Sequence, residues 1–210
     1  MNLDYYNEGV QYCQKRIIEM KYIVSGTDRK DSNSLKISRL IQKIYADQKE
    51  QVEIIDLSTL GLSNMNGPFY GKETPPDAIK TWVDKLGASD GLILVVPEYN
   101  GSYPGILKYF IDHWRYPETF EFRPVCFVGL GGMFGGLRPV EHLQQVFGYR
   151  NAFIYPERVF LINVWKNLSP QGDLLDLSTL DLLKKQISGF RKFCRALSEA
   201  NLHAQNHGKN

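Results

Sequence analysis

Residues 92–108 constrain the fold of this chain more than any other segment. The first five of them are all apolar, and Pro97 follows directly. An uninterrupted apolar run is typical of a parallel strand that helices cover on both faces, because neither face then meets water. Asn100-Gly101 is a turn pair, and Pro104 stands where the first turn of a helix accepts proline. An ordinary strand-to-helix connection has the same pattern, so the rest of the chain decides whether the loop is functional.

Strands and helices alternate along the whole chain. Apolar runs that read as strands lie at 22–24, 52–57, 92–96, 125–130 and 159–164. Between and after them, apolar residues recur with helical spacing. Because right-handed crossovers place helices on both faces of a parallel sheet, this order predicts a doubly wound α/β domain with five parallel strands. We expect the domain at residues 21–200, an N-terminal extension at 1–20 and a polar tail at 201–210.

Composition narrows the classes of function. The 25 Lys and Arg residues are scattered among 23 Asp and Glu residues, which argues against nucleic acid as a partner. Cys13, Cys126 and Cys194 are odd in number and far apart, which indicates neither a disulfide framework nor a zinc site. No window approaches the ~20 apolar residues of a membrane span, and the start of the chain does not resemble a secretory signal. We therefore expect a cytoplasmic protein with no membrane partner.

Two histidines close to the C-terminus are the nearest approach to a metal-binding pattern. His203 and His207 are four residues apart, a spacing that helical metal sites also use. They lie in a polar terminal segment, however, and such segments are usually solvated. We expect a solvated tail and no metal site.

A second polar loop follows the strand expected at 22–24. Residues 25–34 place hydroxyl groups, an amide and a guanidinium directly before a helix. Backbone N–H groups and the positive end of the helix dipole favour an anion there, and Arg29 could neutralise a phosphate. Ser32, Asn33 or Ser34 could also cap the helix, and the two roles do not exclude each other.

Two common phosphate motifs are missing from the sequence. It contains no G-x-x-x-x-G-K-[ST], which argues against a P-loop nucleoside triphosphatase. Only Gly26 is available after the first strand, where a Rossmann dinucleotide site has G-x-G-x-x-G. A phosphate loop built from Ser, Thr and Arg suits a mononucleotide instead.

A third loop, at residues 129–136, is rich in glycine. Glycines let the backbone approach a flat ligand closely, although a tight turn without function has the same composition. In open α/β sheets, ligands bind beyond the carboxyl ends of the strands. Because all three loops follow expected strands, we predict that they form one binding site at that edge.

The three loops together resemble the NAD(P)H-dependent FMN reductase family of flavodoxin-like proteins, which includes quinone, azo-dye and chromate reductases. The resemblance covers residues 21–164. The family's flavin-ring loop is similar to residues 97–108 followed by Ile111-Asp112. Its phosphate loop is similar to Gly26-Thr27-x-Arg29-x-x-Ser32-x-Ser34, and its glycine loop to Gly131-Gly132-x-x-Gly135-Gly136.

The resemblance implies a flavodoxin-like fold that binds FMN, with NADPH or NADH as co-substrate. It implies that the FMN phosphate is held by Thr27, Arg29, Ser32, Asn33 and Ser34. It also implies that the isoalloxazine ring lies against the backbone of Pro97, Glu98, Tyr99 and Asn100. Gly131, Gly132 and Gly135 would lie beside the ring or on the phosphate side. We expect no catalytic acid or base among the side chains, because the cofactor carries the chemistry.

The implied reaction is ping-pong. NAD(P)H would reduce the flavin and leave before a flavin, quinone or similar small electron acceptor enters. Family members usually form homodimers or homotetramers, so we expect a homo-oligomer. Two alternatives stay open: a flavodoxin-like electron carrier, which would not oxidise NADPH steadily, and a flavin-binding or sensing module without turnover.

Overall fold

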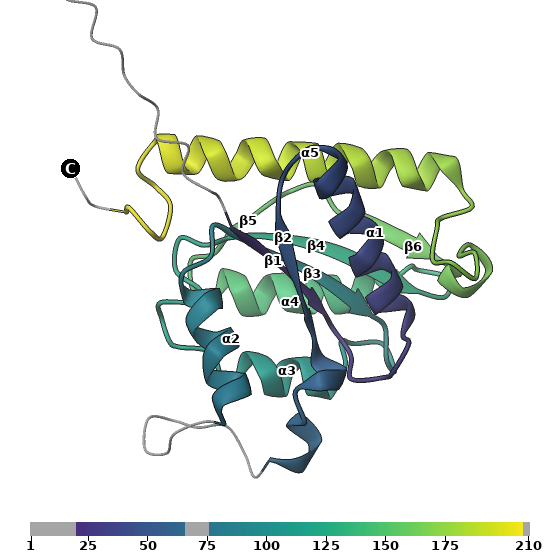
Figure 1. Ribbon diagram of the computed structural model, residues 1–210, viewed down its shortest axis with the longest axis horizontal. Coiled ribbons are helices and arrows are strands. Elements are labelled where there is room, and N and C mark those ends of the chain that lie inside the picture. The colour runs from purple at the N-terminus through teal and green to yellow at the C-terminus, as the bar shows by residue number, and fades with distance from the viewer. Residues whose placement is uncertain (1–19, 66–75, 208–210) are drawn as a thin grey trace, which may run out of the picture.

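The computed structural model describes residues 20–65 and 76–207, and Figure 1 shows them as a parallel sheet between helices. The expected N-terminal extension lies outside the described residues, apart from Met20. The strands are β1 (Lys21–Ser25), β2 (Val52–Asp56), β3 (Gly91–Pro97), β4 (Pro124–Gly131), β5 (Phe153–Ile154) and β6 (Val159–Ile162). The α-helices are α1 (Asn33–Asp47), α2 (Asp77–Gly87), α3 (Gly105–Ile111), α4 (Leu137–Gly148) and α5 (Leu177–Glu199). Short 3-10 turns are η1 (Leu57–Thr59), η2 (Leu62–Asn64) and η3 (Val164–Lys166).

The strands run in the order β2-β1-β3-β4-β5, all parallel, and β6 also pairs with β4. This confirms the predicted doubly wound parallel sheet. The chain direction across the sheet reverses between β1 and β3, which is where ligands bind in such sheets. β1 lies between β2 and β3, with Ile23 beside both Ile54 and Ile93.

The expected strand at 159–164 is β6, and β5 is a further short strand that the apolar runs did not predict. β5 pairs with the first residues of β4 and β6 with the last, so both extend the same edge of the sheet. Pro156 lies between them and has no N–H to donate to the ladder, which explains the interruption. β6 ends at Ile162, two residues before the end that the apolar run predicts.

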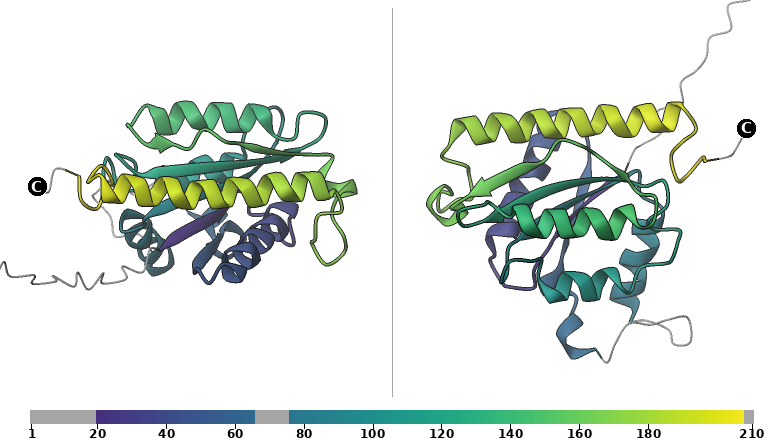
Figure 2. Two further views of the ribbon diagram at one scale, coloured as in Figure 1. Left: turned by 90° about the horizontal axis from the view of Figure 1, so that it is seen from above. Right: turned by 180° about the vertical axis from the view of Figure 1, so that it is seen from behind.

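Helices cover both faces of the sheet, as the apolar runs predict. α1 and α5 lie on one face, and α2, α3 and α4 lie on the other (Figure 2). Two hydrophobic clusters fill the layers, one around Leu94 and Phe127 and the other around Ile93 and Phe190. Within residues 20–65 and 76–207, no helix combines the length and apolarity needed to cross a membrane.

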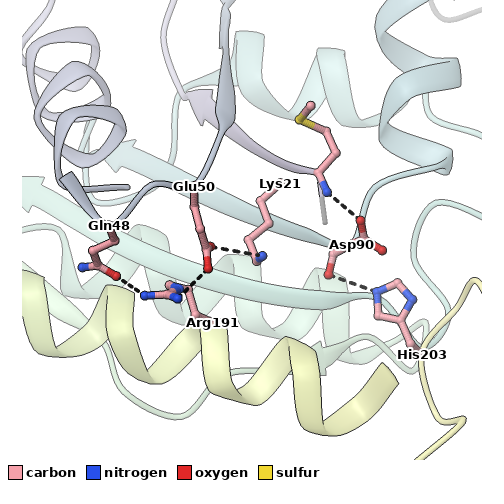
Figure 3. Close-up of polar contacts among 7 residues, drawn as sticks. Lys21, Gln48, Glu50, Asp90, Arg191 and His203 are labelled. Carbon is pink, nitrogen blue, oxygen red and sulfur yellow. Dashed lines mark hydrogen bonds and ion pairs between the residues drawn. The ribbon is translucent and has the colours of Figure 1, made fainter. Parts of the chain in front are cut away.

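The C-terminal segment is partly packed: His203 is buried, so the prediction of a solvated tail is wrong for that residue, whereas the rest of 201–207 is exposed or half-buried. His203 is only 1% exposed, and its Nε2 donates to the backbone oxygen of Asp90 at 3.0 Å (Figure 3). The His207 ring stacks on Phe122 with 3.6 Å between the ring centroids. A polar composition did not reveal these contacts, because each imidazole meets its partner only after the chain returns to the sheet.

Near His203, a charged cluster joins the start of β1 to α5 (Figure 3). The buried Lys21 lies 3.8 Å from the Glu50 carboxylate, and Arg191 of α5 contacts the same carboxylate at 2.6 Å. Arg191 also donates to the side chain of Gln48. This cluster lies at the amino end of β1, so it leaves the carboxyl ends of the strands free for the site.

Candidate functional site

A cavity of about 220 Å³ lies at the carboxyl ends of β1, β3 and β4. Nine of the twelve predicted site residues line it: Thr27, Arg29, Ser32, Asn33, Ser34, Pro97, Glu98, Tyr99 and Gly131. The predicted residues that do not line it are Asn100, Gly132 and Gly135. The cavity is also lined by Lys30, Asp31, Leu130, Val164 and Trp165.

The N-terminus of α1 forms one side of the cavity. The side chain of Ser32 caps the helix, because its Oγ accepts the N–H of Leu35 at 3.1 Å. Ser34 is 1% exposed, and its Oγ has no hydrogen-bond partner. A buried hydroxyl without a partner costs free energy, so a ligand acceptor at this position would be stabilising.

The charge at this side of the cavity favours an anion. Arg29 and Lys30 both line it, and among the described residues neither forms an ion pair. The positive end of the α1 dipole and the N–H groups of its first turn add to their effect. Asp31 also lines the cavity and opposes this charge in part. Together with the hydroxyl of Ser34, these groups match the donors that a phosphate monoester requires.

Thr27 lines the cavity, but its hydroxyl is engaged with two neighbouring groups of the protein. It is 1% exposed, and its Oγ1 lies 2.8 Å from the hydroxyl of Tyr99. The same Oγ1 accepts the N–H of Arg29 at 3.3 Å. The Thr27 hydroxyl therefore joins the loop after β1 to the loop after β3 and orients Arg29.

Two backbone N–H groups of the loop after β3 donate to acceptors within the protein. The N–H of Glu98 donates to the oxygen of Leu130 at 2.9 Å, and the N–H of Tyr99 donates to the oxygen of Ser102 at 2.8 Å. Asn100 adopts a positive φ of 51° at the tip of this turn. Those two N–H groups are thus engaged within the protein, while Pro97, Glu98 and Tyr99 remain as walls.

Of the glycines in residues 129–136, only Gly131 borders the cavity. A Cβ on Gly131 would lie 3.2 Å from the side chain of Glu98, so a larger residue there would crowd the wall. Gly135 faces β6 instead, since a Cβ at this position would lie 3.0 Å from Phe160. Its role is close packing of the loop on the sheet.

Sequence reasoning missed Val164 and Trp165. Both lie in η3, directly after β6, at the same edge of the sheet as the three loops. The rule that ligands bind beyond the carboxyl ends of strands applies equally to the connection that follows β6. The signal was therefore present, but the connection carries no phosphate or glycine motif.

The arrangement suits a ligand with a phosphate at one end and a flat ring at the other. FMN has this form, and the unpartnered Ser34 hydroxyl, Arg29 and the α1 N-terminus fit its phosphate. The close approach at Gly131 and the side chains after β3 offer a surface for a ring.

Comparisons with known proteins agree with this geometry. The family model described as NADPH-dependent FMN reductase matches residues 22–167. A quinone reductase of Escherichia coli is 30% identical over 174 residues, which cover 80% of this chain and 91% of that protein. An NAD(P)H-dependent FMN reductase of Pseudomonas aeruginosa is 31% identical over 151 residues, 70% of this chain and 80% of that protein. Among solved structures, a flavoenzyme NAD(P)H:(acceptor) oxidoreductase of Paracoccus denitrificans superimposes with a TM-score of 0.67 at 20% identity, covering 86% of this chain and 98% of that one.

Proposed function

Because this chain belongs to the NADPH-dependent FMN reductase family, we propose that it is an FMN-dependent oxidoreductase that takes a hydride from NAD(P)H and reduces a quinone or a similar small acceptor. The observation that carries this proposal is the unpartnered, buried Ser34 hydroxyl in a cavity that also contains Arg29 and the wall after β3. The quinone reductase relative, which aligns over most of this chain, supports the acceptor class.

The residues around the phosphate have distinct roles in this proposal. Arg29 and the N–H groups of the α1 N-terminus bind the phosphate, and the hydroxyl of Ser34 donates a hydrogen bond to it. Ser32 caps α1 and so keeps that N-terminus in place. Asn33 lies in the first turn, where its N–H has no acceptor within the helix. Thr27 orients Arg29 and anchors Tyr99.

The walls after β3 and β4 bind and orient the ring. Pro97, Glu98 and Tyr99 form one wall, and Gly131 lets the backbone come close. Bound FMN would supply the redox chemistry, which is the transfer of a hydride from NAD(P)H to the acceptor. The quinone takes up a proton as well as the hydride, and solvent water supplies that proton in this proposal, so the protein contributes position and electrostatics. NAD(P)H would leave before the acceptor enters the same site, which is a ping-pong mechanism.

Assembly and cellular location are part of the same proposal. A groove of about 530 Å³ between α3 and α4 includes the exposed rings of Tyr116 and Tyr149, which supports a homodimer or homotetramer. Cys126 is a free thiol buried in the core, which supports a cytoplasmic protein.

The test begins with the purified protein, which is incubated with FMN and desalted. We expect the flavin absorbance to be retained, to bleach when NADPH or NADH is added without oxygen, and to return when a quinone is added. Initial rates at several quinone concentrations should give parallel double-reciprocal lines. Retained FMN that neither NADPH nor NADH reduces would contradict the enzyme and favour a carrier or a sensing module.

A further inference from the structure

Trp165 lines the cavity. It lies close to the end of the segment that the family model matches, residues 22–167. It is held in η3 by two contacts of the flanking asparagines. The backbone N–H of Asn163 donates to the backbone oxygen of Gly132 at 3.1 Å. The side-chain amide of Asn167 donates to the backbone oxygen of Ile162 at 2.9 Å. Asn163 itself adopts a positive φ of 48°. The turn is therefore fixed to β6 and to the glycine loop on both sides of Trp165.

The two apolar residues of this turn have opposite environments. Val164 is 3% exposed and packs in the core, whereas Trp165 is 58% exposed. The edge of the indole lies beside the glycine loop, since a Cβ on Gly132 would be 3.5 Å from Trp165 Cη2. An exposed indole that lines a cavity gains burial when a flat ligand enters.

Trp165 differs from its exposed apolar neighbours. Met133, Phe134 and Ile162 are 76%, 53% and 51% exposed, and they lie on the two segments that flank the cavity. Of these four side chains, Trp165 alone lines the cavity that contains Arg29 and Ser34. A surface that only covered another protein would not require the indole to share a cavity with phosphate donors.

We infer that Trp165 is a cofactor-contact residue whose indole packs against bound FMN and increases its affinity. This inference rests on the proposed function, because it requires that the cavity binds FMN. It adds a fourth element, the turn after β6, to the three loops that the sequence indicated.

The chain has three tryptophans, so each can be observed separately by fluorine NMR. The protein is labelled with 5-fluorotryptophan, and the Trp165 and Trp82 signals are assigned with the variants Trp165→Phe and Trp82→Phe. We expect saturating FMN to shift the Trp165 signal most, because the flavin ring current acts over short distances. Trp82 is the matched control, since it lies on α2 and packs edge-to-face on Tyr22 of β1. Inorganic phosphate, which has no ring, should leave the Trp165 signal nearly in place.

Calorimetry then measures the contribution to binding. We expect Trp165→Ala to weaken FMN binding by about tenfold and Trp82→Phe to leave it unchanged. Because Trp165 is exposed, its variants should fold, and circular dichroism checks this. If Trp165→Ala were misfolded, Trp165→Phe would take its place with a smaller expected loss.

Two results would overturn the inference. One is a Trp165 signal that does not move although FMN binds the wild-type protein. The other is FMN affinity that is the same in the folded Trp165 variants and the wild type. Failure of the proposed function looks different, because the wild-type protein would then not bind FMN at all.

Discussion

The hydroxyl groups of Thr27 and Tyr99 lie 2.8 Å apart and join two loops that are 72 residues apart in the chain. Thr27 follows β1, which ends at Ser25, and Tyr99 follows β3, which ends at Pro97. Because β1 and β3 are neighbours in the sheet, this bond connects the proposed phosphate side of the cavity to the proposed ring side. It therefore helps to hold the two sides of the cavity in a fixed relation.

The bond predicts coupling between these two residues. Thr27→Val and Tyr99→Phe should each weaken FMN binding by about three- to tenfold, the effect of about 1 kcal/mol from one lost hydrogen bond. The double variant should lose little more than Thr27→Val alone, because that substitution already removes the bond to Tyr99, along with the bond from the Arg29 N–H. Calorimetric titration of all four proteins measures the coupling. Strictly additive losses would contradict it, and Tyr149→Phe, an exposed tyrosine outside the cavity, is the control.

The charge of Arg29 predicts selectivity for the phosphate. Arg29→Ala should weaken FMN binding by about 10- to 100-fold, since a hydrogen bond to a charged group contributes about 1.5–3 kcal/mol. Riboflavin, which has no phosphate, should bind the variant and the wild type alike. Arg39→Ala is the matched control, because Arg39 is exposed on α1 and does not line the cavity. An equal loss of FMN and riboflavin affinity would mean that Arg29 shapes the loop and does not bind the phosphate.

The backbone at Gly136 predicts a structural requirement for glycine. Its φ is +83°, and a Cβ there would lie 2.5 Å from the backbone nitrogen of Leu130. Gly136→Ala should therefore reduce the free energy of unfolding by about 2 kcal/mol or more, from backbone strain and steric conflict. Gly105→Ala is the control, because a Cβ on Gly105 has no atom within 4 Å. Urea denaturation followed by circular dichroism compares them, and equal stabilities would refute the strain.

The raised pKa of Tyr155 should make the free energy of unfolding depend on pH in the alkaline range. Burial, followed by the negative charge of Glu157, raises the pKa of Tyr155 to about 12, while an unfolded tyrosine has a pKa of about 10. Between these values the folded protein keeps the phenol proton and the unfolded chain loses it. The free energy of unfolding should therefore fall as pH rises, by about 1.4 kcal/mol per unit from this group.

The variant Tyr155→Phe isolates that contribution. Urea denaturation at about pH 9 and about pH 11 gives the free energy of unfolding of both proteins. We expect the stability advantage of the wild type over the variant to shrink at the higher pH, because the phenylalanine does not titrate. An advantage that stays constant would mean that the pKa of Tyr155 is not raised.

The sequence by itself determined the order and type of the helices and of every strand except the short β5, and the edge of the sheet where most of the predicted site residues gather. Continuous apolar runs such as 92–96 report burial on both faces, and the following loops must emerge at the carboxyl ends of parallel strands. These features depend on neighbours in the sequence, so local patterns contain them. Nine of the twelve site residues predicted in this way line one cavity of the structure.

Only the tertiary structure decided which polar groups are engaged and which face the cavity. The hydroxyl of Thr27 meets Tyr99, the indole of Trp165 reaches the cavity, and His203 meets Asp90, each through the packing of distant elements. A hydrogen bond depends on atomic positions within a few tenths of an ångström. Residue types and spacings along the chain do not specify distances between separate elements, because those follow from how the helices pack on the sheet.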